Sequence, residues 1–118
     1  MKRRVMIVDD VADIRLMLRY LIEKEDYVIV AEAANGLEAV EKYHEHLPDI
    51  TIMDIDMPFK TGVEAAREIR AVVDHARIIF CSGGISSYEN GPLEFGIGGD
   101  SLVRKPFLPS QLYRAMAM

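Results

Sequence analysis

The sequence has little of several features that mark disulfide-stabilised, membrane-spanning or nucleic-acid-binding proteins. It has one cysteine, so no internal disulfide can form. Its apolar runs are about four residues long, far short of the roughly 20 that cross a bilayer. It has no excess of basic residues, because 14 lysines and arginines are outnumbered by 19 acidic residues. The resulting net charge of −5 argues against sequence-independent binding to nucleic acid or to an anionic membrane surface.

The length of the chain indicates one domain. The 118 residues are typical of a single compact domain, which we expect to occupy residues 1–118. A chain of this size buries roughly two thirds of its unfolded surface, enough to fold without disulfides or structural metals. The N-terminus begins with charge like a signal peptide, but its apolar stretch stops at Asp9 and Asp10. Together with the single cysteine, this predicts a cytoplasmic protein.

Continuous apolar runs predict a buried parallel sheet. Such runs, without alternation of polar residues, are typical of strands that are covered on both faces. They occur at residues 5–8, 28–31 and 78–81 and, apart from Thr51, at residues 50–53; residues 101–104 are predicted to form a short fifth strand. The intervening segments have apolar residues at helical spacing, which predicts helices over residues 14–22, 37–47, 63–73 and 111–116. Alternating strands and helices indicate an α/β fold with helices on both faces of the sheet.

A fourth helix between residues 85 and 100 is expected to be short or distorted. This stretch contains residues that penalise helix interiors, namely Gly91, Pro92, Gly96, Gly98 and Gly99.

Polar residues that end the strands of a parallel sheet meet at one edge. Asp9 and Asp10 follow the first predicted strand, Asp54 the third, Ser82 the fourth and Lys105 the fifth. Three carboxylates close together repel one another, and one takes up a proton unless a cation lies among them. One lysine is insufficient, whereas Mg²⁺ suits oxygen ligands of this kind. A carboxylate beside a metal ion, an ammonium and a hydroxyl forms a phosphoryl site in which Asp54 could act as the nucleophile.

Each of these residues taken alone also has an ordinary structural explanation. Aspartates at the end of a strand commonly cap the next helix. Asp56 before Pro58 could be a turn residue, and so could Ser82 beside Gly83. Lys105 alone would be a solvated loop lysine. The prediction of a phosphoryl site therefore depends on the ordered set.

That ordered set resembles the receiver domain of two-component response regulators, the CheY-like family, over essentially the whole chain. The matching positions are Asp9 and Asp10 with Arg15 following, residues 54–58 (DIDMP), Gly62, Ser82 and residues 105–107 (KPF). The resemblance implies a single doubly wound (βα)5 flavodoxin-like fold with a five-stranded parallel sheet in the order 2-1-3-4-5. It also implies a signalling switch rather than an enzyme that turns over a substrate.

The resemblance assigns a Mg²⁺ site to four residues. Asp10 resembles the direct ligand and Asp9 the ligand that acts through water. Asp54 is expected to bind the ion as well, and Asp56 to contribute its backbone carbonyl.

The resemblance also assigns the phosphoryl chemistry and its partners. Asp54 is implied to be the phosphoacceptor, with a histidine kinase or a histidine phosphotransfer protein as the donor. Lys105 resembles the residue that contacts the phosphate, and Ser82 the hydroxyl that moves onto the phosphoryl group. The Lys105–Pro106 bond is expected to be cis, and the amides of Asp56 and Gly83 to donate to the phosphate. The downstream protein partner is not specified, and a phosphorylation-dependent dimer is one form that the output could take.

One position departs from the family pattern. Leu102 stands where an aromatic residue usually rotates inward on activation, which argues against that form of gating.

Two other functions stay open. The pair Asp54 and Asp56 also resembles the nucleophile motif of haloacid-dehalogenase-type phosphatases, although in those enzymes the motif usually follows the first strand of a larger domain. The third possibility is a receiver that binds or dimerises without phosphorylation. The chain contains no recognisable DNA-binding segment.

Overall fold

The apolar segments form one parallel sheet in the computed structural model, which describes residues 2–82 and 102–117. The strands are β1 (Arg3–Val8), β2 (Tyr27–Ala33), β3 (Ile50–Met53), β4 (Ile78–Ser82) and β5 (Leu102–Arg104). Their order is β2-β1-β3-β4-β5, and every neighbouring pair is parallel. This confirms the expected doubly wound α/β fold.

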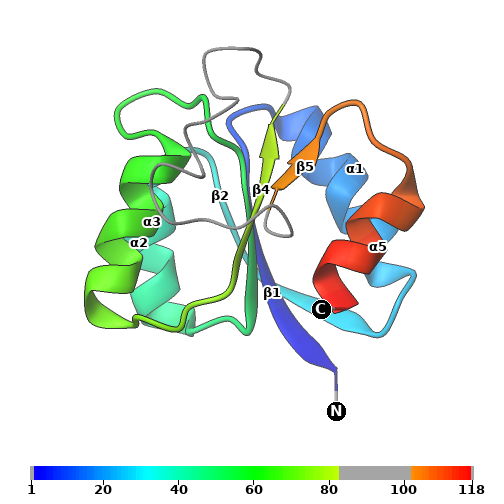
Figure 1. Ribbon diagram of the computed structural model, residues 1–118, viewed down its shortest axis with the longest axis horizontal. Helices are drawn as coiled ribbons and strands as arrows, with labels where there is room; N and C mark the ends of the chain where they lie inside the picture. Colours follow the sequence, from blue (N-terminus) through cyan, green and yellow to red (C-terminus); the bar gives the residue numbers. More distant parts are fainter. Residues whose placement is uncertain (1, 83–101, 118) are drawn as a thin grey trace.

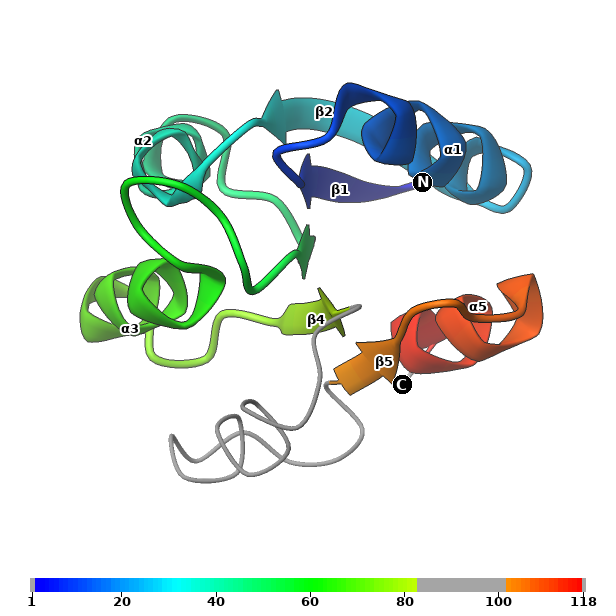
Figure 2. The same ribbon diagram turned by 90° about the horizontal axis from the view of Figure 1, so that it is seen from above.

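Helices cover both faces of the sheet (Figures 1 and 2). The helices are α1 (Ala12–Glu23), α2 (Gly36–His46), α3 (Gly62–Val72) and α5 (Pro109–Ala117). Leu18 of α1 and Leu112 of α5 are buried in the core on one face, and Ile69 of α3 is buried in the core on the other. The two separate cores explain why residues 5–8, 50–53 and 78–81 of the central strands are almost entirely apolar.

The winding of the sheet reverses between β1 and β3. The chain passes from β1 outward to β2 and then returns to β3 on the other side of β1. In this class of fold, ligands bind outside the carboxyl ends of the strands at such a switch point. Asp9 follows β1 and Asp54 follows β3, so the topology places acidic residues on both sides of this crevice.

Side chains of the preceding residues cap two of the helices. Asn35 accepts a hydrogen bond from the Glu38 amide at the start of α2, at 2.9 Å. Thr61 and Glu64 form a reciprocal capping box at the start of α3. The residue before α1 is Val11, whose side chain cannot cap the helix, and Asp13 lies inside the first turn. Asp13 therefore contributes a favourable charge at the helix N-terminus and does not cap it.

Strand β2 is longer than predicted, and its pairing with β1 contains a register shift. The register shifts between Val5, which pairs with Ile29, and Met6, which pairs with Ala31. The apolar run ends at Ala31, so the sequence pattern placed the strand end there, but pairing continues through Glu32. The charged side chain of Glu32 lies in a regular strand position because two arginines of α1 contact it.

The last helix also begins earlier than predicted, at Pro109 instead of residue 111. Proline is well tolerated in the first turn of a helix, because backbone amides there have no hydrogen-bond acceptor within the helix and the missing N–H costs nothing. The prediction of a short or distorted fourth helix concerns residues outside those that the structure describes.

The single cysteine, Cys81, is buried in the core, and burial raises the pKa of its thiol to about 12. Across residues 2–82 and 102–117, none of the helices is both long and apolar enough to cross a membrane.

Candidate functional site

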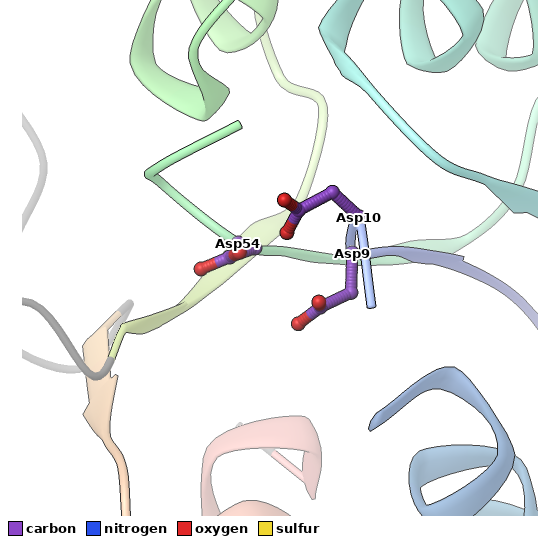
Figure 3. Close-up of side chains that lie close together, drawn as sticks. All are labelled: Asp9, Asp10 and Asp54. Carbon is purple, nitrogen blue, oxygen red and sulfur yellow. The ribbon is translucent and has the colours of Figure 1, made fainter. Parts of the chain in front are cut away.

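Three carboxylates meet at the switch point of the sheet. Asp9 and Asp10 extend from the end of β1 and Asp54 from the end of β3, as Figure 3 shows. One carboxylate oxygen from each residue lies within 4.8 Å of the other two. Asp9 and Asp54 are buried, whereas Asp10 is exposed. The cluster is therefore open to solvent on the side of Asp10.

Hydrogen bonds hold Asp9 through both its backbone and its side chain. Its amide donates to the Ala33 carbonyl at 3.1 Å, which continues the pairing of β1 with β2. One carboxylate oxygen accepts from the Val11 amide at 2.9 Å, and the other accepts from Lys105 Nζ at 2.8 Å. Its backbone carbonyl accepts from Arg15 Nη1 at 2.7 Å. Asp9 is thus a fixed carboxylate whose two oxygens already have donors.

Asp54 is less well neutralised than Asp9. Its Oδ1 accepts from the Ile55 amide at 2.9 Å, while Lys105 Nζ lies 3.7 Å away. The pKa of Asp54 is raised from an ordinary value of 3.8 to about 6, mainly by burial; the negative charges of Asp9 and Asp10 contribute to the rise, and Lys105 opposes it. The ionised form of Asp54 is therefore destabilised in the absence of an added cation.

Lys105 links the fifth strand to this cluster. Burial lowers its pKa, but the hydrogen bond to Asp9 and the charge of Asp54 outweigh burial, so the pKa lies above its usual value. Lys105 is therefore a permanent cation between two carboxylates.

The donor set of the cluster fits Mg²⁺. Three carboxylates supply oxygen atoms within a few ångströms, and Asp10 on the solvent side leaves room for the water ligands that Mg²⁺ retains. The single ammonium of Lys105 does not balance three carboxylates, which leaves an excess of negative charge in the cluster. Asp10 and Asp54 are the better direct ligands, because both oxygens of Asp9 already accept hydrogen bonds.

Close packing of backbone fixes the segment that follows Asp54. The Gly62 amide donates to the Ile55 carbonyl at 2.9 Å. A Cβ atom on Gly62 would lie 1.9 Å from the Asp54 carbonyl oxygen, so only glycine fits there. Gly62 therefore lets the loop turn back directly beneath the acidic cluster.

The other predicted site residues lie at the same edge of the sheet, and their roles stay predictions. Asp56 is exposed two residues after Asp54, and its side chain is not part of the acidic cluster. Ser82 ends β4, where it pairs with Arg104, and the structure describes its backbone only. The Lys105–Pro106 bond is cis, as expected. Gly83 lies outside the described residues.

Sequence reasoning assigned no role to three charged residues beside the cluster, namely Arg15, Arg19 and Glu32. Arg15 reaches from α1 to Glu32 on β2, with Nε 3.3 Å from Oε1, and Arg19 contacts the other oxygen of Glu32. Arginines four residues apart on a helix share one face, and Glu32 interrupts an otherwise apolar strand. These two signals could have indicated the contact, but the pairing of α1 with β2 was needed to reveal it.

The geometry defines an α/β protein with an acidic cluster at the switch point of its sheet, and the comparisons identify the family. The chain belongs to the response regulator receiver domain family, which it matches over residues 5–117. It is 43% identical over 117 residues to the chemotaxis protein CheY of Thermotoga maritima, covering 98% of this chain and 96% of that protein. It is 40% identical over 117 residues to CheY of Bacillus subtilis, with the same coverage of both chains.

A solved structure supports the same assignment. The chain resembles the CheX–CheY–BeF3–Mg²⁺ complex from Borrelia burgdorferi with a TM-score of 0.86 and 31% sequence identity, covering 98% of this chain and 87% of that chain. The protein is thus similar to response regulators of two-component signalling over nearly its whole length.

Proposed function

We propose that this receiver domain is a phosphorylation-controlled switch in which Asp54 accepts a phosphoryl group with the help of Mg²⁺. The donor is the phosphohistidine of a histidine kinase or of a histidine phosphotransfer protein. The observation that carries the proposal is the buried Asp54 carboxylate, which lies 3.7 Å from Lys105 and within 4.8 Å of Asp9 and Asp10. The Mg²⁺ and BeF3 of the related CheX–CheY complex support the choice of metal and of chemistry.

The transfer requires little covalent chemistry from the protein. An oxygen of Asp54 attacks phosphorus, the bond between phosphorus and the histidine nitrogen breaks, and the imidazole leaves with the electron pair. Lys105 stabilises the equatorial oxygens of the transferred group by its positive charge. Ser82 is assigned the hydroxyl that later moves onto the phosphoryl group. Bound Mg²⁺ would supply further positive charge, held by Asp10, Asp54, the Asp56 carbonyl and, through water, Asp9.

Phosphorylation changes the partners of Lys105. In the present structure its ammonium donates to Asp9 at 2.8 Å and is farther from Asp54. A phosphoryl group on Asp54 adds negative charge on the far side of this ammonium and attracts it away from Asp9. This competition is a local event that can bias a two-state equilibrium, which a protein partner would then recognise.

Phosphorylation with acetyl phosphate and Mg²⁺ tests the proposal. Intact-mass spectrometry should show one added phosphoryl group on the wild type, and none on Asp54→Ala. Asp74→Asn is a suitable control, because the Asp74 side chain is 96% exposed on the loop before β4. Equal labelling of the wild type and Asp54→Ala would refute the assignment of the phosphoacceptor. Beryllofluoride with Mg²⁺ should likewise shift the NMR spectrum of the wild type and leave that of Asp54→Ala unchanged.

The same protein preparations separate the other candidate functions. A haloacid-dehalogenase-type phosphatase using Asp54 and Asp56 would release phosphate steadily from small phosphoesters, whereas the proposed switch forms one stable adduct per chain. If the receiver acts without phosphorylation, the wild type and Asp54→Ala would bind the protein partner with the same affinity. Size-exclusion chromatography with and without beryllofluoride tests whether activation produces a dimer.

A further inference from the structure

A semi-buried charged cluster lies beside the acidic site, on the opposite side from Lys105. It consists of Arg15 and Arg19 of α1 and Glu32 of β2, which we call the arginine clamp. Their side chains are between 21% and 36% exposed, which is low for three charged residues on a helix and an edge strand. Such a cluster is held in place better than a fully exposed ion pair, so it can position neighbouring groups.

The clamp uses both oxygens of one carboxylate. Arg15 Nε lies 3.3 Å from Glu32 Oε1, and Arg19 Nε donates to Glu32 Oε2 at 2.8 Å. Residue Glu32 pairs with Ile7 two residues before Asp9, so its backbone is part of the sheet. Glu32 therefore anchors the guanidinium of Arg15 to a rigid element.

The anchored guanidinium reaches the chain between the two aspartates. Arg15 Nη1 donates to the Asp9 carbonyl at 2.7 Å. That carbonyl belongs to the planar peptide unit that joins Asp9 to Asp10, so a bond to its oxygen fixes the orientation of the whole unit. The direction in which the Asp10 side chain leaves the backbone follows from that orientation.

Asp10 depends on its backbone for positioning. Among residues 2–82 and 102–117, no hydrogen bond or ion pair holds the Asp10 carboxylate, whereas Asp9 and Asp54 each accept a bond from a neighbouring amide. Asp10 is also exposed, so packing restricts it less than it restricts the other two.

We infer that Arg15, anchored by Glu32, is a positioning residue that orients Asp10 toward the Mg²⁺ site. This inference rests on the proposed function, because it assigns the support of the same metal site. Residues that support metal ligands from behind typically change metal affinity by about 10-fold to 100-fold when they are removed.

Mg²⁺ titration calorimetry on Arg15→Gln distinguishes positioning from simple electrostatics. Removing a positive charge beside an acidic cluster strengthens Mg²⁺ binding if only charge matters. Positioning predicts the opposite, a loss of affinity of about 10-fold. Arg15→Lys keeps the positive charge but replaces the planar guanidinium, which can donate to Glu32 and to the Asp9 carbonyl together, with a compact ammonium. This variant should also bind Mg²⁺ more weakly than the wild type. Wild-type or tighter binding by either variant that folds would overturn the inference.

Glu32→Gln tests the anchor, with Glu23→Gln as its matched control. Both variants remove one negative charge from a partner of Arg19, but Glu23 contacts only the exposed side of that guanidinium, at 3.3 Å from Nη1. Glu32→Gln should weaken Mg²⁺ binding several-fold, and Glu23→Gln should leave it unchanged. The double variant Arg15→Gln/Glu32→Gln should bind about as weakly as Arg15→Gln alone, because the two residues act as one unit. Additive losses would contradict the anchor.

Melting temperatures without metal separate positioning from a general loss of structure. The control is Glu68→Gln, which breaks an ion pair between an exposed residue of α3 and Lys60. Circular dichroism should show that Arg15→Gln and Glu68→Gln melt within a few degrees of the wild type, while only Arg15→Gln loses Mg²⁺ affinity. A loss of stability with unchanged Mg²⁺ affinity would show that Arg15 has a merely structural role.

Asp10→Asn is the reference variant for the metal site itself. If Asp10→Asn binds Mg²⁺ like the wild type, the proposed metal site fails. If Asp10→Asn loses Mg²⁺ binding while Arg15→Gln does not, only the positioning role of Arg15 fails.

Discussion

Neutralising Asp54 should stabilise the protein in the absence of metal, and the effect should depend on pH. Burial raises the pKa of Asp54 from 3.8 to about 6, so the folded protein holds this proton more tightly than the unfolded chain does. The free energy of unfolding therefore falls as the pH rises from about 4 to about 6, and the penalty is complete above pH 6. Asp54→Asn keeps the shape of the side chain and removes the charge that causes the penalty.

The structure bounds the size of the effect. A rise of about two pKa units corresponds to almost 3 kcal/mol for a fully buried group. The cluster opens to solvent beside Asp10, and solvent screens the charges there, so we take about half of that value, roughly 1 to 1.5 kcal/mol. For a domain of this size, such a gain raises the melting temperature by about 4 to 6 °C.

Thermal melts of the wild type and Asp54→Asn in EDTA, between pH 4.5 and pH 8, measure this gain. The two proteins should differ least at pH 4.5 and most above pH 6.5. Addition of Mg²⁺ at pH 8 should raise the melting temperature of the wild type more than that of the variant, because the ion stabilises the ionised carboxylate. Asp74→Asn makes the same chemical change at a side chain that is 96% exposed and should show no such pH dependence.

Two results would refute this reasoning. A wild type that is more stable than Asp54→Asn at pH 8 in EDTA would show that the carboxylate is stabilised by its surroundings. A stability difference that stays constant from pH 4.5 to pH 8 would show that it does not arise from the ionisation of Asp54.

Three further substitutions test the packing and charge balance of the site. Gly62→Ala should lower the free energy of unfolding in urea by about 2 kcal/mol or more, because its Cβ would lie 1.9 Å from the Asp54 carbonyl oxygen; a variant as stable as the wild type would contradict the close packing. Lys105→Met removes the donor that lies 2.8 Å from the buried Asp9 carboxylate and should cost about 1 to 3 kcal/mol at pH 8 in EDTA, with a larger recovery on adding Mg²⁺ than the wild type shows. Equal melting curves for this variant and the wild type would contradict that charge balance. Thr51→Val should raise stability by about 1 kcal/mol, since the buried Thr51 hydroxyl has no hydrogen-bond partner among the described residues; a clear loss in the same urea titration would reveal a partner for it.

The sequence pattern predicted the sheet better than it predicted element boundaries. Continuous apolar runs identify buried strands because both faces of each strand need apolar side chains. The extension of β2 through Glu32 was missed, since a charge at that position is stable only beside the arginines of α1. The start of α5 at Pro109 was missed because proline ends most helices but is also suited to begin one.

In the candidate site, the sequence predicted which residues come together but not which contacts hold each of them. Aspartates after β1 and β3 and the lysine after β5 are local features of the sequence, and parallel strands bring their carboxyl ends together. Which carboxylate is fixed and which is free could not be predicted. Asp9 is held by Val11, Lys105 and Arg15, whereas Asp10 beside it is exposed.

The fold class and the acidic residues at the strand ends can be read from the sequence, because burial on both faces leaves continuous apolar runs and the aspartates follow these runs directly. The balance of charge and the hydrogen bonds of each carboxylate depend on the tertiary structure. Lys105 is 96 residues from Asp9 along the chain, and Glu32 contacts Arg15 across two elements, so both contacts exist only after the sheet and helices have packed. Their energies depend on distance and burial, which a sequence pattern does not contain.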